Sequence, residues 1–368
     1  MKQYDASALL TRAEIDLKAL SHNYRVIKKL SPGRRIIPVI KADAYGHGAA
    51  AVGAHLASEH GVEDFGLARV IEGAQLREQG LKKQNLIILG GLYKGEVPEI
   101  VKYSLEPSVF SVPESKALNK EAARARKKIK VHVKINTGMN RLGLRPSDAP
   151  GFLKYLKRLE NLSIRSIYTH FYDSDSENET SVKKQSELFT VLREHAGPGV
   201  FMHAANSAAI IKYPYAYFSA VRPGIMLYGS SSDENMVKKS GVKPVMSFKT
   251  RVVNVIELKA GETVSYGATY KARKKERIAI IAAGYGDGFR RDFSNRAEVL
   301  IGRKRCKVAG RVCMDLTAVK VTKDVKQGDE AVIFGEGLPV SALASLAGTI
   351  SYEIFTGITQ RVVRVYKR

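Results

Sequence analysis

The feature that most constrains the fold is an alternation of short apolar runs with longer amphipathic stretches over residues 1–230. Eight runs have the length and composition of buried strands, and they lie at 35–40, 64–68, 85–89, 107–110, 130–135, 163–170, 200–204 and 219–223. Between them, apolar residues recur at helical spacing, most clearly over 49–60, 68–80, 116–127 and 181–195. Eight strands that alternate with helices predict an α/β fold, a (β/α)8 barrel of the TIM type. The alternative is an open doubly wound sheet, but no GxGxxG motif follows an early strand.

Beyond residue 235 the sequence changes to β-branched runs separated by Gly, Asp and Lys. These runs predict strands within 246–258, 277–289, 297–321 and 329–335, and only 341–351 has helical spacing. We therefore expect a barrel domain over 1–235 and a mostly-β domain over 236–368, joined by the polar segment 230–244. The first ten residues are assigned to the barrel domain, with pairing to the β domain as the alternative.

The composition bounds the protein class. The two cysteines, Cys306 and Cys313, form no CxxC pair and have no His cluster nearby, so we expect free thiols and no metal site. The N-terminus has no apolar core of a signal peptide, and no apolar run is long enough to span a membrane, which together predict a cytoplasmic protein. The net charge of +24 admits nucleic-acid binding. However, the Lys and Arg residues are spread along the chain without interleaved aromatics, which favours a solvated basic surface.

Reactive side chains follow the predicted barrel strands. Functional groups of such barrels gather at the C-terminal ends of the strands. A lysine at this position is costly as a buried ammonium, whereas as a Schiff base to an aldehyde cofactor most of that cost disappears. The alternative is a lysine simply exposed at the barrel mouth. The residues at these strand ends are Lys41, Arg141, His170, Asn206, Ser207 and Arg222.

The segment 222–225, Arg-Pro-Gly-Ile, offers backbone N–H groups near a turn, where a phosphate can be cradled. Ser207 and Tyr45 can add hydroxyl donors to that phosphate. His170 either faces the cofactor ring or is an ordinary hydrogen-bonded strand-end residue. Arg222 can reach a pyridine nitrogen and, because it stays protonated, would keep that nitrogen neutral. A weakened electron sink of this kind favours quick reprotonation of a carbanion, and hence racemisation over transamination.

Seven blocks of sequence occur in a fixed order: IKADAYGHG (40–48), NTGMNRLG (136–143), HAANSA (203–208), RPGIMLYG (222–229), VSYGATY (264–270), GYGDGF (284–289) and GRVCMD (310–315). With these blocks the chain resembles bacterial alanine racemases of the barrel-plus-β-domain kind, from about residue 12 to the C-terminus. The resemblance implies a racemase that interconverts L- and D-alanine with pyridoxal 5'-phosphate and supplies D-alanine for peptidoglycan.

The resemblance also implies roles for single residues. Lys41 would carry the cofactor and act as the base on the D-side, and Tyr266 would be the opposing base, with a pKa lowered by nearby positive charge. Arg141 would contact the phenolic oxygen of the cofactor and the substrate carboxylate, which the backbone of Met314 would also contact. Lys134 is either carbamylated, and then holds Arg141, or an ordinary strand lysine.

Further contacts complete the expected site. Tyr352 would bind the phosphate, and Tyr285 would lie at the substrate entrance. In the family, Tyr266 and Met314 come from the second subunit, so a homodimer with shared active sites is expected. The cofactor-binding set is then Lys41, Tyr45, His170, Asn206, Ser207, Arg222, Gly224, Ile225 and Tyr352.

Some residues depart from the family pattern. Asn136 stands where Asp is usual, Leu316 where Gln is usual, and the segment 171–179 is less rich in small residues than is common. These departures leave open a racemase of broader range that accepts serine or basic amino acids. Decarboxylases of the same architecture fit less well, since their C-terminal cysteine motif is missing. A nucleic-acid-binding protein is the alternative from a different functional class. It would explain the basic charge but none of the strand-end residues.

Overall fold

The computed structural model describes residues 9–368 except residue 94 and residues 232–233. The chain divides into two compact units. One comprises the chain up to Leu20 together with Lys243–Arg368, and the other is Ser21–Val242. The boundary predicted from the sequence, after residue 235, lies close to the division between Val242 and Lys243. Of the chain before Ser21, residues 9–20 group with the C-terminal unit. The prediction for the first ten residues concerns mainly residues 1–8, which lie outside the described residues.

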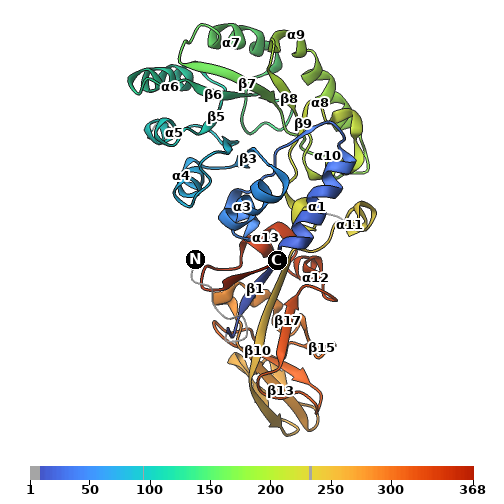
Figure 1. Ribbon diagram of the computed structural model, residues 1–368. Helices are drawn as coiled ribbons and strands as arrows, with labels where there is room; N and C mark the ends of the chain where they lie inside the picture. The colour runs from blue at the N-terminus through green and yellow to red at the C-terminus, as the bar shows by residue number, and fades with distance from the viewer. Residues whose placement is uncertain (1–8, 94, 232–233) are drawn as a thin grey trace. The chain divides into compact units, whose positions relative to one another are not determined.

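The unit Ser21–Val242 contains eight parallel strands surrounded by helices (Figure 1). Hydrogen-bonded neighbours follow the order β2-β9-β8-β7-β6-β5-β4-β3. The ring is closed by a parallel bridge between Val39 and Gly66, flanked by a bond from Ile40 N to Gly66 O of 2.9 Å. The predicted (β/α)8 barrel is therefore confirmed. Its strands are β2 (Arg35–Ile36), β3 (Asp64–Leu67), β4 (Asn85–Ile88), β5 (Glu106–Val109), β6 (Ile129–Lys134), β7 (Leu162–Tyr168), β8 (Phe201–His203) and β9 (Ala220–Val221).

The helices follow local sequence signals. Ser111 caps the N-terminus of α6 (Val112–Arg124), because its side chain accepts a hydrogen bond from Glu114 N. Pro113 lies in the first turn of this helix, where its missing N–H costs nothing. The stretch predicted as one helix over 181–195 forms two, and Thr190 at the break donates its hydroxyl to Ser186 O, a bond that weakens and bends helices. The helices are α1 (Leu17–Leu30), α2 (Lys41–Tyr45), α3 (Ala49–His60), α4 (Val70–Glu78), α5 (Val97–Tyr103), α6 (Val112–Arg124), α7 (Ala149–Leu156), α8 (Thr180–Thr190), α9 (Arg193–Ala196), α10 (Ser207–Lys212) and α11 (Glu234–Ser240).

The inside of the barrel is unusually polar. His132, Ser166 and His203 have no exposed surface, and Ser108 and Tyr168 are 1% and 2% exposed. Buried polar groups are costly unless they are hydrogen-bonded, and these side chains bond to one another. The barrel is thus filled by a hydrogen-bonded layer as well as by aliphatic side chains such as those of Ile37, Ile87 and Ala220.

The other unit is mostly β. An eight-stranded sheet has the order β15-β14-β17-β10-β1-β18, with β13 pairing β10 and β16, and β11 and β12 form a separate pair. The strand β10 matches its predicted bounds, and its side chains alternate in burial up to Val252. The elements are β1 (Arg12–Asp16), β10 (Met246–Leu258), β11 (Thr263–Val264), β12 (Tyr270–Lys271), β13 (Glu276–Ile281), β14 (Glu298–Ile301), β15 (Lys304–Lys307), β16 (Thr317–Val321), β17 (Glu330–Phe334), β18 (Val363–Lys367), α12 (Val340–Leu346) and α13 (Ser351–Thr356).

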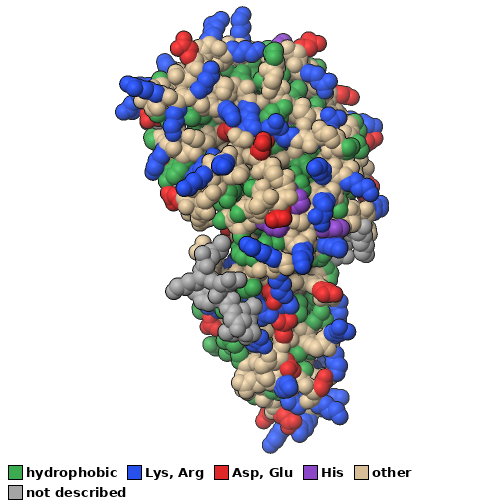
Figure 2. All heavy atoms as spheres, in the orientation of Figure 1, with side chains coloured by type: hydrophobic (Ala, Val, Ile, Leu, Met, Phe, Trp, Pro, Cys, Tyr) green, Lys and Arg blue, Asp and Glu red, His purple; other side chains and the backbone are tan. Residues whose placement is uncertain are grey.

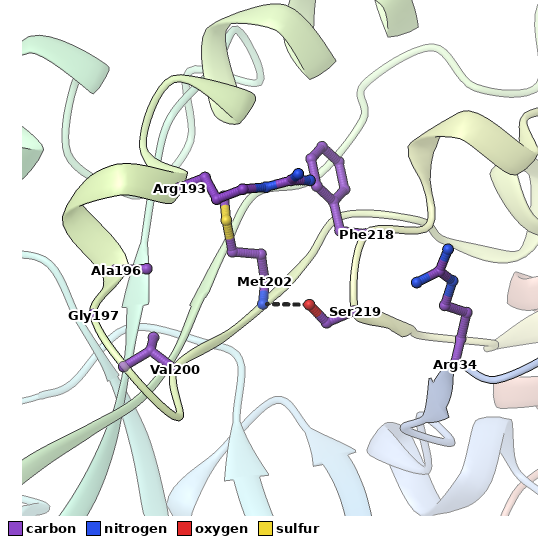
Figure 3. A pocket seen from close by; sticks show the side chains of 8 residues that line it. All are labelled: Arg34, Arg193, Ala196, Gly197, Val200, Met202, Phe218 and Ser219. Atoms are coloured by element: carbon purple, nitrogen blue, oxygen red, sulfur yellow. Dashed lines mark hydrogen bonds between the residues drawn. The ribbon is translucent and has the colours of Figure 1, made fainter.

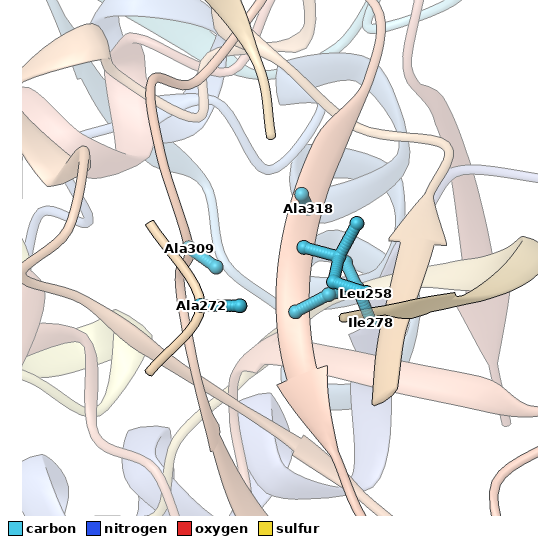
Figure 4. Packing of buried hydrophobic residues seen from close by; sticks show 5 residues of the cluster. All are labelled: Leu258, Ala272, Ile278, Ala309 and Ala318. Carbon is cyan, nitrogen blue, oxygen red and sulfur yellow. The ribbon is translucent and has the colours of Figure 1, made fainter. Parts of the chain in front are cut away.

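Two features hold this unit together. Small and branched side chains from facing segments, among them Leu258, Ile278 and Ala318, pack into one buried cluster (Figure 4). In addition, β1 lies between β10 and β18, so residues from both ends of the chain share one sheet. Glu14 on β1 is 6% exposed and pairs with Lys249 at 3.1 Å and with Lys367. Burial alone would raise the pKa of Glu14, but the bonds from these lysines lower it to about 2.

Charged side chains are spread over the visible surface. Figure 2 shows Lys and Arg side chains on every part of the face drawn, with acidic side chains between them. This spread is typical of a solvated basic surface rather than of one continuous stripe for a polyanion. Over residues 9–368, apart from the three positions named above, no helix is both long and apolar enough to cross a bilayer.

Candidate active site

Lys41 begins a turn of left-handed helix. Ala42, Asp43, Ala44 and Tyr45 have φ values between 49° and 55°. Left-handed helix costs L-residues about 1–2 kcal/mol each, so the surroundings must hold this turn in place. Part of the support comes from backbone bonds such as Gly46 N to Ala42 O, 2.9 Å. The sequence predicted a strand that ends in Lys41. The regular ladder of β2 instead stops at Ile36, although backbone bonds continue to Ile40.

Glu72 on α4 anchors the start of this turn. Its Oε1 accepts from Ala42 N at 2.6 Å, and its Oε2 accepts from Ala68 N and Arg69 N at 2.8 and 3.0 Å. The same carboxylate therefore caps α4 and fixes the backbone next to Lys41. A role for Glu72 was not predicted from the sequence. The signal that could have indicated this role is the position of Glu72 in the first turn of the helix predicted over 68–80.

The ammonium of Lys41 lies in an environment that favours its neutral form. Part of the side chain is exposed, but enough protein surrounds Nζ for desolvation to lower its pKa. The positive charge of Arg141 lowers it further, and the charge of Glu72 opposes this. A neutral amine is the nucleophile that attacks an aldehyde, so the shift has the sign that a cofactor lysine needs.

A small backbone cradle lies beside Tyr45. A Cβ placed on Gly224 would lie 2.6 Å from Tyr45 Oη, so any other residue there would force the Tyr45 side chain to move. Ser207 Oγ accepts from Gly224 N at 2.9 Å and from Met226 N at 3.3 Å. The predicted phosphate residues Tyr45, Ser207 and Gly224 are thus brought together, and Ile225 follows in the same turn. Asn206 has a different role. Its Oδ1 accepts a hydrogen bond from Ala209 N and so caps the N-terminus of α10.

Arg222 is 3% exposed, and several acceptors orient its guanidinium. Nη1 donates to His203 Nδ1, while Nη2 donates to Thr169 O at 2.7 Å, to Ala204 O at 2.8 Å and to His170 Nδ1 at 3.3 Å. Burial lowers the pKa of Arg222 to about 10. Burial, and then the charge of Arg222, lower the pKa values of His170 and His203 well below the ordinary value. Both imidazoles are therefore neutral bases that accept from Arg222.

Lys134 ends β6 on the same side of the barrel. It is 7% exposed, and its Nζ donates to Leu89 O at 3.3 Å and lies 5.4 Å from the ring centroid of Tyr168. Desolvation lowers the pKa of Lys134 to about 8, and the charges of Arg141, Arg222 and Lys41 act in the same direction. Lys41, Lys134, Arg141 and Arg222 are thus close enough to influence one another, which makes the barrel mouth a site for anions.

The loop that carries Arg141 is organised by Asn136. Asn136 Oδ1 accepts from Gly138 N at 3.1 Å and Asn140 N at 2.9 Å, and its Nδ2 donates to Asn140 Oδ1 at 3.0 Å. An aspartate could accept the two backbone bonds but could not donate the third. The substitution of Asn for the more usual Asp therefore keeps the loop closed.

Three predicted residues of the other unit lie on neighbouring turns. Tyr266 is 72% exposed, and its turn contacts Arg311, whose Nη1 is 2.9 Å from the Cβ position of Gly267. The backbone of Tyr285 bonds to Cys313 O, and Gly286 N bonds to Met314 O. Tyr285 and Met314 are 43% and 52% exposed. Tyr352 lies on α13. The structure thus brings together Tyr266, Tyr285 and Met314 in one unit and the lysine and arginine cluster in the other.

A pocket of about 380 Å³ lies at the N-terminal ends of the barrel strands, and Figure 3 shows the residues that line it. It is lined by residues that directly precede strands, such as Arg34 before β2, Val200 before β8 and Ser219 before β9. The N-terminal face of such barrels serves stability rather than chemistry. The cation-lined mouth is therefore the better candidate for the active site.

Comparison with known proteins identifies the family. The family description "Alanine racemase, N-terminal domain" matches residues 15–232, and "Alanine racemase, C-terminal domain" matches residues 245–366. The chain belongs to the alanine racemase family. The resemblance seen in the sequence is thereby confirmed, and with it the expectation of a racemase, an isomerase.

Named relatives can be aligned with this chain over almost its whole length. The alanine racemase of Carboxydothermus hydrogenoformans is 40% identical, covering 96% of this chain and 98% of the relative, and that of Halothermothrix orenii is 38% identical with 97% of each covered. Among solved structures, the alanine racemase of Clostridium difficile has a TM-score of 0.93 at 35% identity, covering 98% of this chain and 96% of that one. That of Streptomyces coelicolor has a TM-score of 0.91 at 33% identity, covering 98% and 99%.

Proposed function

We propose that this alanine racemase family member interconverts L-alanine and D-alanine, with pyridoxal 5'-phosphate bound covalently through Lys41. The observation that carries the proposal is the desolvated amine of Lys41 beside the Tyr45–Ser207–Gly224 cradle and the Arg222–His170 pair. The relatives named above are alanine racemases, which supports alanine as the substrate. The product D-alanine would supply peptidoglycan synthesis.

The residues fit a phosphorylated aldehyde cofactor. The cradle offers the Tyr45 hydroxyl and the Ser207 hydroxyl, whose oxygen is held by the N–H groups of Gly224 and Met226, and a Cβ at Gly224 would displace Tyr45 Oη. The cation cluster of Lys41, Lys134, Arg141 and Arg222 suits a ligand with several negative charges. When bound, pyridoxal phosphate supplies an electron sink that makes the α-proton of an amino acid removable. Tyr352 and Asn206 complete the cofactor set that we infer, and Ile225 N would contribute to the cradle.

Arg222 would donate a hydrogen bond to the pyridine nitrogen. Its Nη2 bonds to three protein acceptors and its Nη1 to one, so among the bonds of the described residues its Nε–H and the second Nη1–H are left to donate to a ring. An arginine with a pKa of about 10 does not give up its proton at neutral pH. The ring nitrogen would then stay unprotonated, which limits charge delocalisation and favours return of the proton to the same carbon. His170, held neutral by Arg222, would face the ring.

A racemase needs one acid–base group on each face of the α-carbon. We infer that Lys41 Nζ takes and returns the proton on one face, and that the hydroxyl of Tyr266 does so on the other. The exposed positions of Tyr266 and Met314 suit residues that complete a site of a second subunit. In a symmetric homodimer, each subunit would give its Tyr266, with Met314 near the substrate carboxylate and Tyr285 at the entrance, to the barrel of its partner.

Lys134 and Arg141 would bind the carboxylate side of the substrate. Because the pKa of Lys134 is about 8, much of the amine is neutral at mildly alkaline pH and can react with carbon dioxide. The resulting carbamate would be negative and would attract Arg141, the strongest charge now acting on Lys134. Arg141 would then be held for the substrate carboxylate. This assignment is preferred to an ordinary strand lysine because the side chain is 7% exposed.

The alternative is a racemase of broader range in the same family. Turnover of a panel of L-amino acids, including alanine, serine and lysine, separates the two. We expect alanine to react fastest by far, and comparable turnover of serine or lysine would favour the broader enzyme. Lys41→Ala should lose both the activity and the visible absorption of the bound cofactor. Lys82→Ala, at an exposed lysine just before β4 and so at the N-terminal end of the strands, should keep both. Full activity in the Lys41 variant would contradict the proposal.

A further inference from the structure

A continuous chain of hydrogen bonds crosses the barrel interior, from the first residue of β5 to the residue after β9. Glu106 Oε2 contacts His132 Nε2 at 3.0 Å, and Ser166 Oγ lies between His132 Nδ1 and His203 Nε2, 2.9 Å from the latter. His203 Nδ1 contacts Arg222 Nη1. All five residues are at most 5% exposed, so water has little access to these hydrogen bonds.

The residues at the two ends of this hydrogen-bond chain, Arg222 and Glu106, determine the direction of every bond in it. Arg222 only donates, so its bond to His203 forms only in the tautomer that presents a lone pair at Nδ1 and carries the proton on Nε2, and this tautomer needs an acceptor for the Nε2–H. That Nε2–H donates to Ser166 Oγ. The single hydrogen of the Ser166 hydroxyl then points to His132 Nδ1, and His132 Nε2–H donates to the Glu106 carboxylate. Each hydrogen therefore points from Arg222 toward Glu106.

Glu106 is a firmly ionised acceptor at the far end. Burial alone would raise its pKa, but the bonds that it accepts from His132 and Arg165, together with the charge of Arg165, lower it. Arg165 Nη1 lies 2.6 Å from the same Oε2, and its Nη2 bonds to Asp64 at 2.6 Å. Lys130 Nζ lies 3.5 Å from the other oxygen. This ion-pair cluster holds the carboxylate in place, and bonds in such a chain polarise one another.

We propose that Glu106 is a positioning residue for Arg222, acting through His132, Ser166 and His203, which together fix His203 in its Nε2–H tautomer. The other tautomer would set an imidazole N–H against the guanidinium N–H of Arg222. The catalytic consequence rests on the proposed function, because a guanidinium in the wrong plane would not meet the pyridine nitrogen. The tautomer itself is a property of the protein without cofactor.

One competing arrangement is distinguishable. If His132 carried a second proton, both imidazoles would donate to Ser166 Oγ, and the Ser166 hydrogen would have no acceptor within the chain. The measurement is therefore nitrogen NMR of the protein with isotopically labelled histidine, before and after addition of pyridoxal phosphate. We expect His132 and His203 to be neutral with the proton on Nε2 in both samples. A proton on Nδ1 of either ring, or a charged His132, would overturn the proposal whatever the protein catalyses.

The matched variants are Ser166→Ala and Ser108→Ala. Both remove one hydroxyl from the barrel interior, but Ser108 bonds to Tyr168 and Ile88 and lies outside the chain. In Ser166→Ala we expect His203 to lose its single tautomer and kcat to fall about tenfold, with KM for alanine within about twofold, because Arg141 is untouched. Ser108→Ala should keep the tautomer of His203. Equal losses of kcat and thermal stability in both variants would show a packing effect and refute positioning.

Glu106→Gln provides a second test that leaves Ser166 in place. The amide can still accept from His132 through its oxygen, but it lacks the charge that polarises the chain. The expected result is an intermediate loss of kcat, with the visible absorption of the bound cofactor shifted as the contact at its ring nitrogen weakens. An unchanged spectrum together with unchanged kcat would contradict the role given to Glu106. Loss of cofactor binding in Lys41→Ala tests the proposed function separately.

Discussion

Replacement of Gly224 by alanine is expected to weaken cofactor binding without unfolding the barrel. The added Cβ would lie 2.6 Å from Tyr45 Oη and 3.3 Å from Tyr45 Cζ, whereas ordinary contact begins at 3.4 Å. Tyr45 is 7% exposed, packs against Tyr228 at 5.1 Å between ring centroids, and belongs to the left-handed turn. It therefore cannot retreat freely, and its hydroxyl must leave the position at which it would meet the phosphate.

The size of the effect follows from the overlap. Forcing an extra methyl group into a packed site costs typically about 1–3 kcal/mol. If most of that cost applies when the cofactor requires the original position of Tyr45, the dissociation constant for pyridoxal phosphate rises about 5- to 100-fold. The free energy of unfolding of the cofactor-free protein should change less, because no phosphate then requires the original position of the Tyr45 hydroxyl.

Titration of the cofactor-free protein with pyridoxal phosphate, followed by fluorescence, measures this directly. Gly151→Ala is the matched control, since a Cβ at Gly151 meets nothing within 4 Å and the residue lies in α7, where alanine is favourable. The control should bind the cofactor as the unmodified protein does. An unchanged dissociation constant in Gly224→Ala would refute the cradle, and equal weakening in both variants would refute the steric argument.

Three more predictions follow from the same structure. Tyr266→Phe should slow removal of the α-proton of L-alanine far more than that of D-alanine, as measured by deuterium exchange from solvent, and equal slowing would exclude two different bases. Labelled bicarbonate should give a carbamate signal on Lys134 that grows as the pH rises through about 8 and is missing in Lys134→Arg, whereas no signal would mark an unmodified lysine. Because the pKa of Glu14 is lowered to about 2, its ion pairs should stabilise the β unit above about pH 4.5 and progressively less as the pH falls toward 2. Thermal unfolding of Glu14→Gln should therefore differ from that of the parent at pH 7 and converge with it near pH 2, and a constant difference would refute this assignment.

Much of the fold could be predicted from periodicity. All eight barrel strands lie within two residues of their predicted bounds or inside them, because strands buried on both faces appear as short apolar runs. The strand β1 was not predicted, since the short run at 12–16 pairs only with β10 and β18, far away in sequence. The break between α8 and α9 depends on a side-chain bond of Thr190, which a helical pattern does not reveal.

The candidate site could be predicted only in part. Strand ends pointed to Lys41, Arg141, His170 and Arg222, because the barrel gathers these ends on one face. The left-handed turn after Lys41 was not predictable, since its alanines and tyrosine normally avoid positive φ, and it depends on Glu72 from another helix. His203 was overlooked although it opens the HAANSA block, because its part in the chain to Arg222 arises only once β7, β8 and β9 are adjacent.

The central claim is that the amine of Lys41 holds the cofactor. Reduction of the cofactor-loaded protein with borohydride fixes the bound cofactor to its lysine, and protease digestion with mass spectrometry identifies that residue. We expect one modified peptide, labelled at Lys41. Label on Lys134 or on another lysine, or a cofactor that washes away after reduction, would contradict the account.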